Sequence, residues 1–181
     1  IVNPFDGYAL EAAARIKDKH PDTRIIVLSM GPEQAKNALK ECLGIAADKA
    51  YLISGRAFGG SDTLATSYIL SCAIKKVAEL EGGFDAIFCG KQAIDGDTAQ
   101  VGPEIAEHLG LPQVTYALEA ELTDDGLTIL KECEDANQKI AVSLPCLVTF
   151  TKPSFDPRYP TIKRKLAANR AEIPVLGEDA F

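Results

Sequence analysis

The sequence predicts an α/β fold, with a doubly wound, mostly parallel, Rossmann-like sheet and an added antiparallel hairpin segment. Short, almost wholly apolar runs, typical of strands buried on both faces, alternate with amphipathic helical runs. Polar turns that contain glycine follow several of these apolar runs and precede helices. The chain has 181 residues, of which 46% are hydrophobic and 25% charged, so one domain with an appendage can bury a sizeable core.

The first part of the chain is predicted to form a helix, a strand, a second helix and a second strand. Residues 7–19 have apolar side chains at helical spacing, and Pro21 ends this helix. Residues 24–29 are an apolar, β-branched run that predicts a strand buried on both faces. Proline in the first turn favours a helix over 32–43, and a weaker strand follows at 50–53.

The same alternation continues through the middle of the chain. A long helix is predicted over 62–80, with Asp62 or Ser61 as its N-cap. Residues 84–89 predict another buried strand, and a polar loop then leads into a helix over 99–109.

The pattern changes to antiparallel structure after a short strand at 113–116. An Asp-Asp-Gly turn at 124–126 lies between two apolar runs and predicts a hairpin. Several prolines after the last strand predict an irregular stretch. The remaining predicted strands are 118–122 and 127–133, on either side of the turn, and then 139–144 and 147–151.

The net charge excludes general binding to nucleic acid or to an anionic membrane surface. The formal charge is −7 and the pI is near 4.9, whereas such binding needs a net basic face. No run approaches the length of a membrane-spanning segment, so no membrane insertion is expected. Residues 151–170 differ, with a local charge of +5, and are predicted to form a partner-facing surface rather than a solvated helix face. Their basic residues are Lys152, Arg158, Lys163, Arg164, Lys165 and Arg170.

No catalytic or metal-binding role is predicted for the cysteines and histidines. The five cysteines lie far apart without a C-x-x-C pair, which predicts reduced thiols and a cytoplasmic location. His20 and His108 lie near predicted helix C-termini and are given no catalytic role. Asp95 and Asp97 have no third carboxylate or histidine nearby, so no metal site is expected. Asp97 or Thr98 is predicted instead to cap the following helix.

Three turns are predicted to lie at the carboxyl edge of the sheet, where open parallel sheets bind their ligands. They are residues 29–32, 56–63 and 90–102, and each follows a predicted strand and opens a helix. Free N–H groups at helix starts bind anions, and glycine lets a phosphate approach the backbone closely. Because no nucleophile and base lie together, the residues predict a nucleotide-binding domain without an evident catalytic triad.

Two functional interpretations stay open at this point. Residues 59–63, Gly-Gly-Ser-Asp-Thr, match the phosphate loop of an ATP-pyrophosphatase-type enzyme. Against this match, Phe58 stands where a serine is expected and the motif follows a later strand. The other interpretation is a nucleotide-sensing module without redox chemistry, which a yellow preparation would exclude.

One longer motif is more specific than these turns. Residues 90–102, GKQAIDGDTAQVG, continue without a gap into PEIAEHLGLPQVT at 103–115. This stretch closely resembles the signature of electron-transfer flavoprotein β subunits. Residues 3–6, 29–32 and 157–159 resemble three further motifs of the family, in the same order and spacing. The resemblance therefore covers essentially the whole chain.

The resemblance implies one subunit of a heterodimer. In this family the β subunit pairs with an α subunit that holds the electron-carrying FAD, and in most members the β subunit binds a structural AMP. Met30 stands where some relatives have cysteine, so a contact through its backbone is expected. The cofactor-binding positions that carry over are Asn3, Pro4, Phe5, Asp6, Met30, Gly90, Lys91, Gln92, Ala93, Ile94, Asp95, Gly96, Asp97, Thr98, Ala99, Gln100 and Val101.

The segment 56–67 resembles the loop of electron-bifurcating members, in which a second FAD replaces AMP and accepts a hydride from NADH. FAD is therefore expected, with AMP as the alternative occupant of the same site. Electrons would pass between NADH or a dehydrogenase and an acceptor such as ferredoxin or a quinone oxidoreductase. This loop adds the cofactor-binding residues Arg56, Gly59, Gly60, Asp62, Thr63 and Thr66.

The resemblance also implies a division near residue 151. Residues 1–151 are the expected nucleotide-binding domain, including the hairpin at 118–144, and 152–181 the partner-recognition loop and the start of a C-terminal segment. An acyl-CoA or 2-hydroxy-acid dehydrogenase is the expected partner, although Ser154 stands where many relatives have leucine. Family members also have a preceding strand and a C-terminal arm, which this chain is expected to lack. The expected partner-binding residues are Lys152, Pro153, Ser154, Phe155, Asp156 and Arg158.

Overall fold

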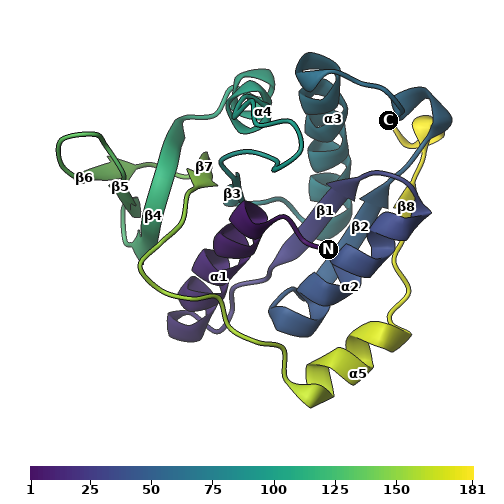
Figure 1. Cartoon of the computed structure of the whole chain (residues 1–181), viewed down its shortest axis with the longest axis horizontal. Helices are drawn as coiled ribbons and strands as arrows, with labels where there is room; N and C mark the ends of the chain where they lie inside the picture. The colour runs from purple at the N-terminus through teal and green to yellow at the C-terminus, as the bar shows by residue number, and fades with distance from the viewer.

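Helices pack on both faces of a layer of mostly parallel strands in the computed structural model, which describes residues 1–181 (Figure 1). This is the predicted fold class. The α-helices are α1 (Pro4–Lys19), α2 (Lys36–Ile45), α3 (Thr63–Glu81), α4 (Val101–Leu109) and α5 (Ile162–Arg170). The strands are β1 (Ile26–Met30), β2 (Lys49–Ile53), β3 (Ala86–Gly90), β4 (Gln113–Thr123), β5 (Gly126–Lys131), β6 (Gln138–Val142), β7 (Cys146–Phe150) and β8 (Val175–Leu176). Single 3-10 turns lie at Glu33–Ala35, Arg56–Phe58 and Glu178–Ala180.

The strands form two hydrogen-bonded sheets, with the orders β1-β2-β8 and β3-β7-β4-β5-β6. All pairs in the first sheet are parallel, as are β3 with β7 and β7 with β4. The pairs β4–β5 and β5–β6 are antiparallel, which confirms the predicted hairpin. The three predicted turns follow the carboxyl ends of parallel strands. In this fold, ligands bind at that edge of the sheet.

Strand β7 lies between β3 and β4 in the larger sheet, and all its residues are buried. Cys146, Val148 and Phe150 point into a core that α1 covers with Ala9, Ala12 and Ile16. Leu147 points the other way, into a core formed with residues of α3 and α4. This alternation follows from the two-residue period of a strand, and it places α1 and the α3–α4 pair on opposite faces.

The prediction of separate strands at 113–116 and 118–122 was wrong, because these residues form one strand, β4. Its ladder is irregular between Ala117 and Glu119, and Tyr116 has a left-handed φ of 58°. The hydroxyl of Thr149 accepts a hydrogen bond from the backbone N–H of Tyr116 at 3.2 Å. The local bulge lets a single strand pair in parallel with β7 and then antiparallel with β5.

The expected burial of two strands, β1 and β3, was wrong. Strands β1 and β3 were predicted to be buried on both faces, but all their residues are half-buried, because each strand has a hydrogen-bonded neighbour on one side alone. Strand β2, predicted to be the weaker one, is almost wholly buried. It lies between β1 and β8, which explains its burial.

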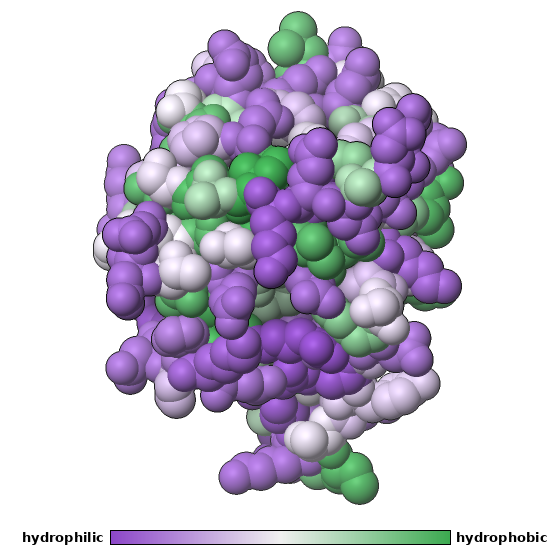
Figure 2. Space-filling view, turned by 90° about the vertical axis from the view of Figure 1, so that its left-hand side faces the viewer, coloured by the Kyte–Doolittle hydropathy of each residue, from purple (hydrophilic) through white to green (hydrophobic).

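The antiparallel end of the larger sheet is less completely covered than its parallel end. Ile140 and Val142 on β6 are half-buried and pack at the border of the main core. Figure 2 looks onto the left-hand side of the molecule as drawn in Figure 1, where β6 lies, and shows hydrophobic residues between hydrophilic ones. None of the helices combines the length and the apolar content needed to cross a bilayer.

A buried carboxylate fixes the end of α3 that lies away from the predicted ligand edge. Glu81, whose side chain is 6% exposed, pairs with Lys49 and with Arg24, and it accepts a hydrogen bond from the hydroxyl of Tyr51. The hydrogen bond from Lys49, together with those from Tyr51 and Arg24, lowers the pKa of Glu81 to about 2. The ionised form therefore stabilises the native state.

We expect Glu81→Gln to lower the free energy of unfolding at pH 7, and the loss to shrink as pH falls from about 4.5 to about 2. The sign follows because the carboxyl group has its ordinary pKa in the unfolded chain and a lower one in the native chain, so its contribution is lost on acidification. Urea unfolding at several pH values measures this. Glu79→Gln is the matched control, because Glu79 is on the same helix and its side chain is 72% exposed. A loss independent of pH would contradict the prediction.

Candidate functional site

The first turn of α1 lies against the carboxyl end of β3. Residues 3–6 were predicted as a turn before a helix that starts at Gly7, but the helix begins at Pro4 with Asn3 as its N-cap. Proline fits the first helical position because its missing N–H has no helical partner there. The helix is thus one turn longer than predicted, and this added turn supplies the contacts with β3.

Two side chains of this turn connect it to β3 and to the loop that follows. Asp6 Oδ1 accepts a hydrogen bond from the backbone N–H of Gly90 at 2.7 Å. Asn3 Nδ2 donates to Asp6 Oδ2 at 2.8 Å and to the carbonyl oxygen of Gln92 at 2.9 Å. Asn3 Oδ1 is buried and has no partner, so it is available to a donor group of a ligand.

Gly90 is needed at this contact for steric reasons. A Cβ atom added there would lie 2.6 Å from Cβ of Phe5 and 2.7 Å from the backbone nitrogen of Asp6. Lys91, the next residue, places its ammonium 4.9 Å from the centre of the Phe5 ring. The structure therefore brings together the two predicted groups at 3–6 and 90–92.

The loop from Lys91 to Gln100 leaves most of its backbone N–H groups free. Inside the chain, Lys91 donates to the carbonyl of Phe150 and Asp97 to that of Ala93, and the other N–H groups have no acceptor. Asp97 and Ala99 have left-handed φ values of 55° and 54°. Such conformations are costly for residues other than glycine and are common at functional sites.

The predicted capping of α4 was wrong. Neither Asp97 nor Thr98 caps the helix, which begins at Val101 after Gln100 and has no side-chain cap bond. The left-handed residues keep the chain out of helical geometry until that point. The loop residues Ala93, Ile94, Asp95, Gly96 and Thr98 are exposed, so they are open to a ligand.

The second predicted turn meets the third one at the start of α3. The hydroxyl of Thr63 lies 3.3 Å from Oε1 of Gln100 and 3.4 Å from Oε1 of Glu104. Asp62 is the N-cap of α3, as predicted, and accepts a hydrogen bond from the N–H of Ala65 at 2.8 Å. The residues Arg56, Gly59 and Gly60, which precede Asp62, are exposed. Thr66, which follows it, is half-buried.

Met30 lies at the carboxyl end of β1, opposite Ile53 in the register with β2. The N–H of Gly31 donates to the carbonyl of Ile53 at 3.0 Å, so the first turn is fixed to the end of β2. Met30 is half-buried, and no side-chain hydrogen bond connects it to the residues of the other two turns.

The C-terminal residues pack on the second turn, which was not predicted. Glu178 Oε1 accepts a hydrogen bond from the N–H of Ala57 at 2.8 Å, and a Cβ atom on Gly55 would lie 2.8 Å from Cγ of Glu178. The rings of Phe58 and Phe181 lie 6.2 Å apart. No local pattern indicates this contact, because it depends on β8 returning beside β2 (Figure 1).

We expect Glu178→Ala to increase hydrogen exchange at the Ala57 amide by about tenfold, since one backbone hydrogen bond to a carboxylate is lost. Global stability should change little, because Glu178 is exposed. Exchange measured by NMR checks this, with Asp179→Ala, a neighbouring exposed residue, as the control. Unchanged exchange at Ala57 would show that the C-terminal residues do not hold this turn.

Half of the predicted partner-recognition loop faces inward. Pro153 is buried, and Phe155 packs under the guanidinium of Arg15, whose Cζ lies 3.6 Å from the ring centre. Arg158 pairs with Glu11 and with Asp18 of α1. Lys152, Ser154 and Asp156 of this loop are exposed.

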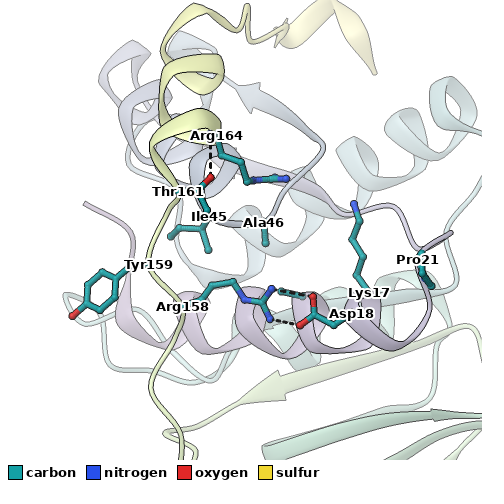
Figure 3. A pocket seen from close by; sticks show the side chains of 10 residues that line it. Lys17, Asp18, Pro21, Ile45, Ala46, Arg158, Tyr159, Thr161 and Arg164 are labelled. Carbon is teal, nitrogen blue, oxygen red and sulfur yellow. Dashed lines mark hydrogen bonds and ion pairs between the residues drawn. The ribbon is translucent and has the colours of Figure 1, made fainter.

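A cavity of about 350 Å³ lies beside this loop, between α1, the end of α2 and the segment 158–164 (Figure 3). Lys17, Arg158 and Arg164 line it, but all three are engaged within the chain. Lys17 pairs with Asp48, and Arg164 donates to the carbonyls of Leu43 and Ala47 at the end of α2. Of the predicted basic surface, Lys152, Lys163, Lys165 and Arg170 stay exposed.

The structure contains no group of three or more histidine, cysteine, aspartate and glutamate side chains that could hold a metal ion. Burial raises the pKa of the Cys89 thiol, near the candidate site, to about 12, so this thiol is not a nucleophile at neutral pH. What the site offers is backbone N–H groups, glycine turns and carboxylates, which can bind a nucleotide but do not form a nucleophile and base.

Comparison with known proteins identifies relatives along the whole chain. A family model described as an electron transfer flavoprotein domain matches residues 1–180. An electron transfer flavoprotein subunit beta from Megasphaera elsdenii is 53% identical over 178 residues, which are 97% of this chain and 66% of that protein.

Two further relatives are named for reductase complexes. The caffeyl-CoA reductase-Etf complex subunit CarD of Acetobacterium woodii is 50% identical over 99% of this chain and 67% of its own length. The acryloyl-CoA reductase electron transfer subunit gamma of Anaerotignum propionicum is 43% identical over 100% of this chain and 67% of its own. The chain thus spans about two thirds of the length of the curated relatives that it matches.

Proposed function

Because the chain belongs to the electron transfer flavoprotein domain family, we propose that it is the nucleotide-binding part of a β subunit and that it binds FAD, with AMP as the alternative occupant. The family match favours electron transfer over the ATP-pyrophosphatase and nucleotide-sensing interpretations. The resemblance inferred from residues 90–115 agrees with this membership.

The observation that carries the proposal is the junction of α1 with the loop after β3. Asp6 and Asn3 fix the loop to the helix, and the loop then presents free N–H groups between Gln92 and Gln100. Free backbone N–H groups at such a turn bind a phosphate. The unpartnered Oδ1 of Asn3 offers an acceptor to a hydroxyl or an amino group of the same ligand.

These residues fit a dinucleotide because two turns meet at the site. Residues 3–6, Met30 and the loop 90–101 would hold the adenylate part, and Arg56, Gly59, Gly60, Asp62, Thr63 and Thr66 would hold the remainder of FAD. The contact of Thr63 with Gln100 supports a continuous site. When bound, the flavin would supply the redox chemistry by accepting a hydride from NADH and releasing electrons. The protein's part is to bind and orient it.

The same family membership supports the proposed partners. We propose a heterodimer with an α subunit and electron exchange with an acyl-CoA or 2-hydroxy-acid dehydrogenase. The exposed side chains of Lys152, Ser154 and Asp156 would contact the dehydrogenase, and Pro153, Phe155 and Arg158 would hold the loop in shape.

The test replaces Asp95, Gly96 and Asp97 together by alanine in the full-length complex. Nucleotide retained after gentle purification, measured by flavin absorbance and by mass spectrometry, should fall by about tenfold or more, since the loop that presents the N–H groups is altered. Replacement of Asp124 and Asp125, in the distant hairpin turn, is the control. Wild-type nucleotide content in the loop variant would contradict the site.

A further inference from the structure

Three oxygen-bearing side chains meet where α3 and α4 begin. The hydroxyl of Thr63 lies 3.3 Å from Oε1 of Gln100 and 3.4 Å from Oε1 of Glu104. Both distances exceed the usual O–H···O length of about 2.7–2.8 Å. One proton is therefore shared, weakly, between two acceptors.

The carboxylate of Glu104 is nearly without donors. Its Oε2 is buried and has no hydrogen-bond partner, and its Oε1 has the long contact with Thr63 alone. No lysine or arginine forms an ion pair with it, whereas the nearby Asp62 is satisfied by the N–H of Ala65. One turn further along α4, Nε2 of His108 is also buried and unpartnered. Buried acceptors without partners are rare in native proteins, because each one costs free energy.

This arrangement selects the kind of ligand group that can lie here. The Glu104 carboxylate repels a phosphate, and so does that of Asp62, the residue before Thr63 in the chain, so the phosphates belong with the free N–H groups of the loop after Lys91. A hydroxyl group suits the place instead, because it donates a proton to Glu104 and leaves the Thr63 proton for Gln100. Nucleotides carry such donors on the sugar of AMP and on the ribose and ribityl chain of FAD.

We propose that Glu104, together with Thr63, recognises a sugar or ribityl hydroxyl of the bound nucleotide. The proposal rests on the proposed function and adds to it a specificity-determining residue that the sequence motifs did not single out. Its chemistry is the same for AMP and FAD, and the experiment separates the two.

The experiment titrates the nucleotide-depleted full-length complex with analogues that lack one hydroxyl. The probes are AMP, 2′-deoxy-AMP, 3′-deoxy-AMP, FAD and three FAD analogues that each lack one ribityl hydroxyl, at 2′, 3′ or 4′. Wild type, Glu104→Ala, Glu104→Gln and the control Glu107→Gln are compared; Glu107 is exposed on the same helix. Loss of the recognised hydroxyl should weaken binding to wild type and to the control by about tenfold or more, and to Glu104→Ala by much less.

The recognised hydroxyl is the one whose removal weakens binding to wild type but not to Glu104→Ala. Its position in the nucleotide shows whether the sugar or the ribityl chain lies at Glu104. Equal losses in wild type and Glu104→Ala for every probe would overturn the proposal, provided that both bind the parent nucleotide. Tighter binding of inorganic pyrophosphate to Glu104→Gln than to wild type would also overturn it, because a phosphate would then lie beside the carboxylate. If wild type binds neither AMP nor FAD, the proposed function itself fails.

Discussion

Replacing Asp6 with alanine is expected to weaken nucleotide binding by about 10- to 100-fold, since hydrogen bonds of a charged group are each worth about 1.5–3 kcal/mol. Asp6 holds the N–H of Gly90 at 2.7 Å and Nδ2 of Asn3 at 2.8 Å. Without it, both the end of β3 and the loop that Asn3 anchors through Gln92 lose their fixed position. Titration of the nucleotide-depleted complex with AMP and FAD measures the loss.

Two further variants test whether the effect depends on the position of the carboxylate and on its charge. Asp22→Ala removes an exposed carboxylate just after the same helix and should leave binding unchanged. Asp6→Asn keeps the shape and one acceptor, so it should bind more tightly than Asp6→Ala. Wild-type affinity in a correctly folded Asp6→Ala complex would show that the junction of α1 with β3 does not position the ligand.

Replacing Arg158 with alanine is expected to lower the free energy of unfolding by about 3 kcal/mol, which corresponds to a fall in Tm of roughly 6–12 °C. The side chain of Glu11 is 4% exposed, and its Oε2 accepts hydrogen bonds from Nε of Arg158 at 2.8 Å and from the backbone N–H at 3.0 Å. Burial alone would raise the pKa of Glu11, but the hydrogen bonds from Arg158 hold it below its ordinary value. Without the guanidinium, the buried charge loses its main partner.

Chemical or thermal unfolding checks this value, and a paired substitution tests its cause. The double variant Glu11→Leu with Arg158→Met should recover much of the stability, because both charges are replaced by apolar groups of similar size. Arg170→Ala, an exposed residue of the same basic segment, should change stability by less than about 0.5 kcal/mol. If Arg158→Ala were as stable as wild type, Arg158 would not stabilise the fold, and a role in binding a partner would be the one left for it.

Most helices and strands could be predicted because their signals are local. The apolar run before Gly90, the Asp62 cap and the turn at 124–126 each depend on a few adjacent residues. The neighbours of a strand are not encoded in this way. An apolar run predicts that β7 is buried, but not that it lies between β3 and β4. The half-burial of β1 could not be predicted for the same reason.

The candidate site was predictable where the family resemblance supplied its motifs. Residues 3–6 and 90–92 were predicted to act together, and the structure places them in contact. Glu178 and Glu104 were missed, because neither was among the positions that the resemblance carried over, and no local pattern indicates their contacts with Ala57 and Thr63.

Arg158 was predicted to face a partner, yet it binds a buried residue of α1. The signal that could have found this is Glu11, which lies among the apolar residues of the helix. A charged residue at a buried position of an amphipathic helix needs an opposite charge from elsewhere in the fold.

The central claim is that the turns at 3–6, 56–63 and 90–101 hold an adenine nucleotide, FAD in preference to AMP. The most direct measurement is the identity and number of nucleotides released by mild denaturation from the full-length heterodimer, read by mass spectrometry. We predict two FAD molecules for each heterodimer and no AMP. Release of one FAD and one AMP would contradict FAD binding by this chain but would agree with a nucleotide site in it. Release of a single FAD without AMP would contradict the nucleotide site itself.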